Sequence, residues 1–281
     1  MTLPPHPFDQ AIALTLQRDN TYVGSSSPGY WNMVGPFGGI SAATVLNAVM
    51  QHPSRLGEPV SLTVNYASAL VQGPFTVMAR PARTNRSTQH WVIEITQAGQ
   101  TGVGETVLTA TLLTAVRRST WGVSDTPMPT VPAPQQIPPQ AGFAPVEWVK
   151  RYEIRAVTGG LPHTWDGALN PHDASSASLT QFWIRDQPPR PLDFPALAAY
   201  ADIFYPRIYL RRARRVPVGT VSMTVYFHAD SAGLRECGDA CVLGQARAQV
   251  FRDGFFDQSA QLWSQSGSLL VTSSQIVYYK E

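Results

Sequence analysis

Cysteine is nearly absent from this sequence: among its 281 residues there are two, Cys237 and Cys241. Two cysteines cannot form a disulfide-built scaffold, and a zinc ribbon needs more ligands at defined spacing. One group of histidines and aspartates matches no standard metal-site spacing and predicts a surface loop: His163, Asp166, His172 and Asp173. We therefore expect no metal site and no other cofactor.

Charge is also scarce. Asp, Glu, Lys and Arg make up 14% of the residues, and the formal net charge is +2. Domains that bind nucleic acid usually show a strong basic excess, so no nucleic-acid partner is expected. The 43% of hydrophobic residues can form a sizeable core, and the low charge argues against a long disordered chain.

Long apolar runs and several common motifs are missing as well. No stretch of about 18 uninterrupted apolar residues exists, so the sequence predicts no membrane span. The segment Met1–Gln10 has neither a basic nor an apolar run typical of a signal peptide, which favours a cytoplasmic protein. The GxGxxG, Walker and Gly-x-Ser-x-Gly patterns are absent, which disfavours those nucleotide sites and an α/β-hydrolase serine enzyme.

Proline, in contrast, is concentrated in one segment. Seven prolines and no charged residue lie between Pro127 and Pro145. Such a segment cannot be the interior of a helix or a central strand, and it is typical of an extended linker. The sequence thus predicts an N-terminal domain (1–117), a proline-rich linker (118–145) and a C-terminal domain (146–281).

The two parts on either side of this linker resemble each other. Val60–Tyr66 and Val221–Phe227 both alternate as half-buried strands do, and a helical segment precedes each, near Phe37–Met50 and Phe194–Tyr205. Further strand-like runs follow in each part. They are Phe75–Arg83, Trp91–Thr96 and Val107–Val116 in the front half, and Val242–Arg252, Ala260–Gln265 and Leu269–Tyr279 in the back half. This order indicates an internal duplication.

The front helix is apolar on most of its sides, which is typical of a buried helix. A sheet that curls around one buried helix is the hotdog architecture. The predicted fold is therefore α+β, a tandem double hotdog in which each half is an antiparallel sheet wrapped around a long helix. The two halves would pack as a pseudo-dimer, with their helices at a common interface.

Gly38 and Gly39 open the front helix. They either form a tight turn or allow a ligand to approach the backbone. In the second case, N–H groups at the helix start can bind a carbonyl oxygen as it becomes negative. We assign Gly38 and Gly39 as candidate substrate-binding residues.

Three polar residues of the back half are candidates for catalysis. Asp202 lies at the border of the apolar face of the back helix, Thr220 begins the next strand, and Gln275 lies in the last strand. Strict alternation would point the side chain of Thr220 opposite to those of Val221 and Met223. Each has an ordinary structural interpretation when taken alone. A carboxylate at the edge of an apolar cleft can also orient or deprotonate a water.

The densest basic cluster contains Arg211, Arg212, Arg214 and Arg215. It is either a solvated loop or a contact for a phosphorylated ligand such as the nucleotide end of coenzyme A. We include Arg211 and Arg212 among the candidate substrate-binding residues.

The back half resembles the type II acyl-CoA thioesterases, which are double-hotdog enzymes. The resemblance lies in Phe182–Arg185, Ala199–Asp202, Gly219–His228 and Thr272–Gln275, and in their order. In front, Phe37-Gly38-Gly39 looks like the Phe-Gly-Gly with which the helix of that family opens. The chain departs from the family at Ser222, where an Asp is often found, and in the run Ala229-Asp230, where Arg-Pro is common.

The resemblance implies hydrolysis of fatty acyl-CoA to free fatty acid and coenzyme A. An Asp, a Ser or Thr and a Gln jointly activate a water in that family, and they correspond to Asp202, Thr220 and Gln275. Two alternatives stay open: a non-catalytic acyl-CoA-binding protein, and a hotdog hydratase or dehydratase that would use His228 with Asp230. Because hotdog sheets commonly pair, we also expect a homodimer or a higher homo-oligomer.

Overall fold

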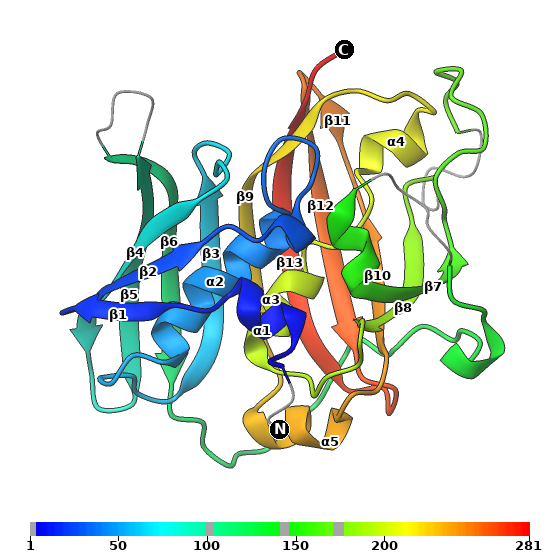
Figure 1. Cartoon of the computed structure of the whole chain (residues 1–281). Coiled ribbons are helices and arrows are strands. Elements are labelled where there is room, and N and C mark those ends of the chain that lie inside the picture. Colours follow the sequence, from blue (N-terminus) through cyan, green and yellow to red (C-terminus); the bar gives the residue numbers. More distant parts are fainter. Residues whose placement is uncertain (1–3, 99–103, 141–145, 171–176) are drawn as a thin grey trace.

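The computed structural model describes residues 4–98, 104–140, 146–170 and 177–281. Their strands form one antiparallel sheet of 13 strands that extends across the whole width of Figure 1. The two longest helical elements near its centre, α2 (Gly38–Met50) and α3 (Phe194–Tyr200), lie on the same side of this sheet. The core fills the space between them and the strands.

Each half of the chain contributes six neighbouring strands of this sheet. The front half supplies, in spatial order, β1 (Thr15–Arg18), β2 (Thr21–Ser25), β4 (Pro74–Thr84), β5 (Thr88–Ala98), β6 (Gly104–Ala115) and β3 (Glu58–Tyr66). The back half continues with β9 (Val218–Phe227), β13 (Leu269–Tyr279), β12 (Phe255–Trp263), β10 (Val242–Arg247), β8 (Thr180–Asp186) and β7 (Tyr152–Thr158), and β11 (Phe251–Arg252) pairs with β12. The predicted strand Val242–Arg252 was wrong in extent, because the chain leaves β10 at Arg247 and turns into β11.

The halves join where β3 pairs with β9. The hydroxyls of Thr63 and Thr224 lie 3.0 Å apart across this joint, and Ser222 donates a hydrogen bond to Asn65 Oδ1 at 2.9 Å. β3 and β9 contain the two alternating segments that the sequence matched to each other. Each is flanked on its other side by the last strand of its own half, β6 or β13, as a duplication requires.

Helix α2 is the buried helix that its composition predicted. Ten of its thirteen residues are buried. Two of its polar side chains have partners inside the protein: Thr44 donates to the carbonyl of Ile40 at 2.8 Å, and Asn47 donates to the carbonyl of Ile12 at 2.8 Å. Polar residues are therefore tolerated on this helix because their hydrogen bonds are satisfied.

The back helix is much shorter than predicted. Asp193 caps α3 by accepting from the N–H of Ala196 at 2.8 Å, as its sequence indicates, but α3 ends at Tyr200 rather than near Tyr205. The hydrogen bonds tighten there, because the N–H of Asp202 donates to Ala199, three residues back. The buried guanidinium of Arg207 then binds the carbonyl of Tyr205 at 2.8 Å. The back half thus has a seven-residue helix in place of the expected long one, followed by α4 (Arg207–Arg211).

The proline-rich segment packs against the back half as far as residue 140, the last described residue before 146. The indole of Trp183 donates to the carbonyl of Pro132 at 2.9 Å, and Arg155 donates to that of Pro134 at 3.0 Å. Met128, Val131 and Ile137 pack on the cluster of Trp183, Cys241, Leu243 and Trp263. The segment therefore covers β8, β10 and β12 on the side away from the helices.

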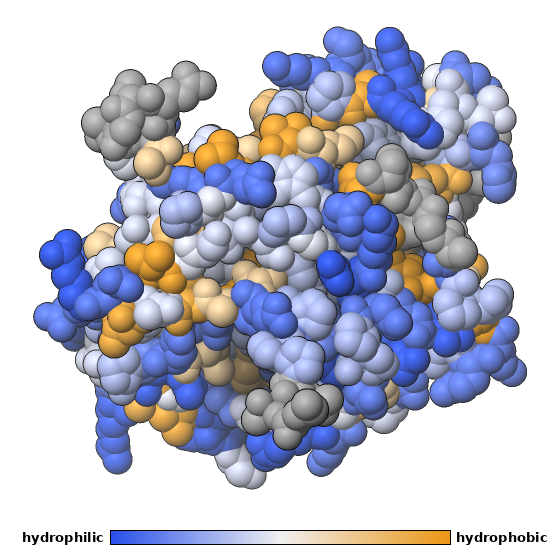
Figure 2. Space-filling view, in the orientation of Figure 1, coloured by the Kyte–Doolittle hydropathy of each residue, from blue (hydrophilic) through white to orange (hydrophobic). Residues whose placement is uncertain are grey.

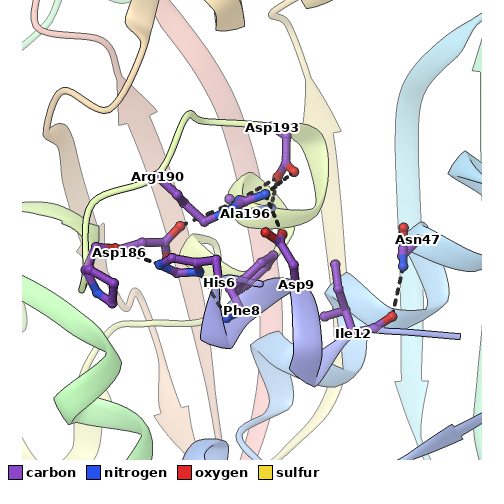
Figure 3. A network of polar contacts seen from close by, with 10 residues as sticks. His6, Phe8, Asp9, Ile12, Asn47, Asp186, Arg190, Asp193 and Ala196 are labelled. Atoms are coloured by element: carbon purple, nitrogen blue, oxygen red, sulfur yellow. Dashed lines mark hydrogen bonds and ion pairs between the residues drawn. The ribbon is translucent and has the colours of Figure 1, made fainter. Parts of the chain in front are cut away.

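The N-terminal segment also ties the halves together. Helix α1 (Pro7–Ala11) lies between α2 and the loop before α3 (Figure 3). His6 Nε2 donates to the carbonyl of Pro188 at 2.7 Å, and Asp9 pairs with Arg190 at 2.8 Å. The sequence interpretation missed this helix, because five residues are too few for a visible hydrophobic period.

Candidate active site

Asp202 stands at the tightened end of α3, where it faces both halves of the chain. Gln275 Nε2 donates to Asp202 Oδ1 at 2.9 Å, and the N–H of Gly39 and the hydroxyl of Thr220 also donate to this carboxylate. The structure therefore brings together Asp202, Thr220, Gln275 and the Gly38–Gly39 pair, which lie far apart in sequence.

Thr220 reaches Asp202 because β9 contains a bulge. Met223 lies opposite Gln275 and Ser222 opposite Ile276, but Val277 lies opposite Thr220, so Val221 is an extra residue. The bulge turns Thr220 to the face that carries Gln275. The expectation from strict alternation, that Thr220 points opposite to Met223, was wrong for this reason.

Gln275 is held firmly. Its side chain is 5% exposed, and its Nε2 also donates to the carbonyl of Ala201 at 3.2 Å and lies 3.2 Å from Met223 Sδ. The contacts with Ala201 and Met223 hold the side-chain amide of Gln275 in place. The hydrogen bond from this amide therefore orients the Asp202 carboxylate before any ligand binds.

Burial raises the pKa of Asp202 to about 7, from an ordinary value of 3.8. The hydrogen bonds from Gln275, Gly39 and Thr220 act in the opposite direction but do not cancel the effect of burial. A carboxylate with a pKa near neutrality can both take up and release a proton at physiological pH.

Tyr66 also belongs to this site, and the sequence interpretation missed it. It ends β3, and its hydroxyl donates to the carbonyl of Gly38 at 3.0 Å. Burial and the charge of Asp202 raise the pKa of Tyr66. Its only sequence signal was its place at the end of the alternating segment Val60–Tyr66.

Among the described residues of the front half, the positions equivalent to Thr220 and Gln275 do not carry the same polar residues. Its strand β3 has a matching bulge at Val60, so Pro59 takes the place of Thr220. Leu112 lies opposite Leu62, as Gln275 lies opposite Met223, so Leu112 takes the place of Gln275. The part of the chain that the structure describes therefore shows this polar set once, and the front half contributes to it through Gly38, Gly39 and Tyr66.

Arg211 and Arg212 are not brought to this site. Arg211 Nη1 donates to the carbonyl of Asn170 at 2.7 Å, and Arg212 pairs with Glu281 at 2.8 Å. Both therefore have partners within the protein.

The histidine of the hydratase alternative lies elsewhere. His228 follows the end of β9 remote from Thr220, and its Nε2 lies 3.0 Å from Thr272 Oγ1. Asp230 instead caps α5 (Ser231–Cys237) by accepting from the N–H of Gly233 at 2.8 Å. This arrangement gives no support to a His–Asp pair for proton transfer.

Within the described ranges, no group of three or more His, Cys, Asp or Glu residues could hold a metal ion. His172 and Asp173, which the sequence singled out, lie outside the described residues. No helix among the described residues is long and apolar enough to cross a membrane.

Comparison with known proteins identifies the family to which this chain belongs. Residues 27–115 match the family model of the acyl-CoA thioesterase N-terminal domain, and residues 126–279 match that of the acyl-CoA thioesterase C-terminal domain. The chain belongs to the acyl-CoA thioesterase family. No curated protein sequence matches it significantly.

Several solved structures share its architecture. A conserved hot dog fold protein of unknown function from Alicyclobacillus acidocaldarius is 44% identical, with a TM-score of 0.89 and 99% of each chain covered. A putative thioesterase II from Thermobifida fusca is 18% identical over 99% of each chain, with a TM-score of 0.79. An acyl-CoA thioesterase II from Mycobacterium marinum is 18% identical, with a TM-score of 0.72, over 97% of this chain and 98% of that one. The hotdog fold is thus established for this chain.

We predict that replacing Gly38 by alanine and replacing Gly39 by alanine will have different effects, the first on activity and the second on stability. A Cβ at Gly38 would lie 2.6 Å from Asp202 Oδ2, whereas a Cβ at Gly39 would lie 2.6 Å from the backbone oxygen of Ala199. We expect Gly38→Ala to displace the carboxylate and lower activity about 10- to 100-fold with little change in stability. We expect Gly39→Ala to push α2 from α3 and cost about 1–3 kcal/mol. Thermal unfolding and activity, measured on both variants, separate the effect on catalysis from the effect on stability. An equal loss of stability in both variants would contradict the different roles given to Gly38 and Gly39.

Proposed function

We propose that this chain hydrolyses an acyl-CoA thioester to the free acid and coenzyme A, with Asp202 as the general base. The observation that carries the proposal is the Asp202 carboxylate, which is held by three donors at the joint of the two halves and has a pKa near 7. Membership of the acyl-CoA thioesterase family supports the substrate class.

In the proposed reaction, Asp202 takes a proton from a water whose oxygen attacks the thioester carbonyl carbon. Thr220 and Gln275 hold the carboxylate, and with it the water, in the position required for attack. The tetrahedral intermediate then breaks its C–S bond. The proton held by Asp202 goes to the sulfur of the leaving coenzyme A.

The start of α2 suits the developing oxyanion. Of the two glycines that the sequence offers at the helix start, Gly39 uses its N–H to donate to Asp202. The N–H of Gly38, the first residue of α2, is not needed for the hydrogen bonds of the helix. We therefore assign oxyanion stabilisation to the N–H of Gly38, aided by the dipole of the thirteen-residue helix.

We also propose the division into residues 1–117, 118–145 and 146–281. The joint between β3 and β9 and the separate matches of residues 27–115 and 126–279 support two domains.

The test of the function is the release of free thiol from a panel of short, medium, long and aromatic acyl-CoAs. We expect release that peaks at one acyl type. Binding of acyl-CoA without thiol release by the folded protein would contradict hydrolysis and favour the binding-protein alternative. Loss of enoyl-CoA absorbance without thiol release would instead indicate a hydratase.

A further inference from the structure

The four arginines of the sequence lie at one end of the sheet, beside the end of the chain. Arg211 ends α4, and the others follow in the loop that leads to β9. Ile208 of α4 and Val216 of this loop pack on Phe256 and Val277. Val277 lies opposite Thr220, on the face that carries the candidate active site. The arginine loop, defined as residues 211–215, therefore lies on the same side of the sheet as Asp202.

The distance from this loop to Asp202 follows from the register of β13. Lys280 is five residues beyond Gln275, and its N–H donates to the carbonyl of Pro217 at 3.1 Å. Five residues of strand span about 17 Å. Gln275 contacts Asp202, and Pro217 is two residues beyond Arg215, so the loop lies about this far from the carboxylate. A phosphopantetheine arm is about as long as five extended residues, roughly 17 Å.

Two of the four arginines are free to meet a ligand. Arg211 and Arg212 are bound to Asn170 and Glu281, whereas Arg214 and Arg215 are exposed. The guanidinium of Arg215 lies 4.6 Å from the ring centre of Trp165. Stacking on an indole restricts the side chain but leaves its in-plane N–H donors available for a phosphate.

Basic side chains also outnumber acidic ones at this end of the molecule. Hydrophilic side chains gather at the top right of Figure 2, over α4 and the end of β13. Among the described residues at this end, six are cationic and four are acidic: Arg211, Arg212, Arg214, Arg215, Arg252 and Lys280 against Asp166, Asp253, Asp257 and Glu281.

We propose that Arg214 and Arg215 bind the phosphate groups at the nucleotide end of coenzyme A while the thioester lies at Asp202. This inference rests on the proposed function, and it refines the sequence interpretation, which chose Arg211 and Arg212. The separation matches the arm that joins the thioester to the phosphates. The two exposed guanidiniums supply charge-assisted hydrogen bonds of the kind that phosphates prefer.

The test compares one acyl group on two carriers, coenzyme A and N-acetylcysteamine, which lacks the nucleotide and its phosphates. In the double variant Arg214→Gln/Arg215→Gln, we expect KM for the acyl-CoA to rise about 10- to 100-fold with kcat nearly unchanged. Hydrolysis of the N-acetylcysteamine thioester should stay at the wild-type rate. A matched control, Arg83→Gln/Arg86→Gln, removes two exposed arginines near the turn between β4 and β5 and should alter neither substrate.

Calorimetric binding of coenzyme A to the same proteins separates the two proposals. If the wild type hydrolyses no thioester but its affinity for coenzyme A falls in the double variant, the function is wrong and the phosphate site stands. The phosphate site is overturned if the double variant retains the wild-type KM and affinity, or if both carriers lose activity equally. Loss confined to acyl groups carried on an acidic carrier protein would also overturn it, since the loop would then recognise a protein.

Discussion

We expect the Asp202→Asn variant to hydrolyse acyl-CoA about 10³-fold more slowly than the wild type. An amide has the shape of the carboxylate but cannot accept the proton of the attacking water. Gln275 can still donate to the remaining oxygen, as it donates to Asp202 Oδ1 at 2.9 Å. The loss should therefore appear in kcat, with KM changed little, when release of coenzyme A thiol is measured.

The stability of the same variant provides the control. The pKa of Asp202 is higher in the folded protein, at about 7, than its ordinary value of 3.8. The ionised carboxyl therefore costs stability as pH rises from about 4 to about 7. Asparagine does not ionise, so the variant should melt no lower than the wild type at pH values above 7. A lower melting temperature would mean that the lost activity reflects unfolding. Asp19→Asn, in the exposed turn before β2, is the matched replacement and should keep full activity.

The pH profile of the wild type tests the same assignment independently. Because the base must be ionised, kcat/KM should fall on the acid side with a midpoint near pH 7 rather than near pH 4. Loss of thioester absorbance can be followed across this range. A rate that stays constant down to about pH 5 would exclude Asp202 as the base.

Much of this site could be predicted from the sequence, since periodicity and composition determine most of its elements. The alternation of Val60–Tyr66 and Val221–Phe227 predicted the two central strands, and the apolar helix Gly38–Met50 was correctly predicted as buried. Asp202 stood out as a carboxylate on the border of an apolar face, and it does lie at the joint of the halves.

The remainder depends on features that local patterns do not encode. The bulge at Val221 reverses the direction of Thr220, and only the pairing with β13 reveals it. The early end of α3 lies in a tightened turn, where the N–H of Asp202 donates to the carbonyl of Ala199. Tyr66 joins the site through its hydrogen bond to Gly38. The bulge and the hydrogen bond of Tyr66 each depend on pairing between segments that lie far apart in the sequence, which the local pattern does not show.

The largest expected effect on stability comes from Arg190. Its guanidinium binds Asp193 Oδ2 at 2.6 Å and Asp9 Oδ1 at 2.8 Å, lies 3.6 Å from Asp186 Oδ2, and stacks on the ring of Phe8 at 4.8 Å (Figure 3). Asp186 is 1% exposed. We expect Arg190→Met to lower the free energy of unfolding by about 3–5 kcal/mol, because it leaves a buried carboxylate without its cation. Chemical denaturation measures this loss directly.

The dependence of this loss on pH identifies its cause. Burial raises the pKa of Asp186 to about 7 even though Arg190 acts to lower it, so removal of Arg190 should raise it further. Below about pH 6 this carboxyl is protonated in both folded proteins, so the deficit of the variant relative to the wild type should be smallest in acid and should grow as pH rises through and above about 7. Adding Asp186→Asn to the variant removes the uncompensated charge and should restore part of the loss.

Lys150→Met is the matched control, since it breaks the exposed pair with Glu147 and should cost at most about 1 kcal/mol. A loss in Arg190→Met no greater than in Lys150→Met would show that Arg190 does not compensate a buried charge at the junction of α1, β8 and α3.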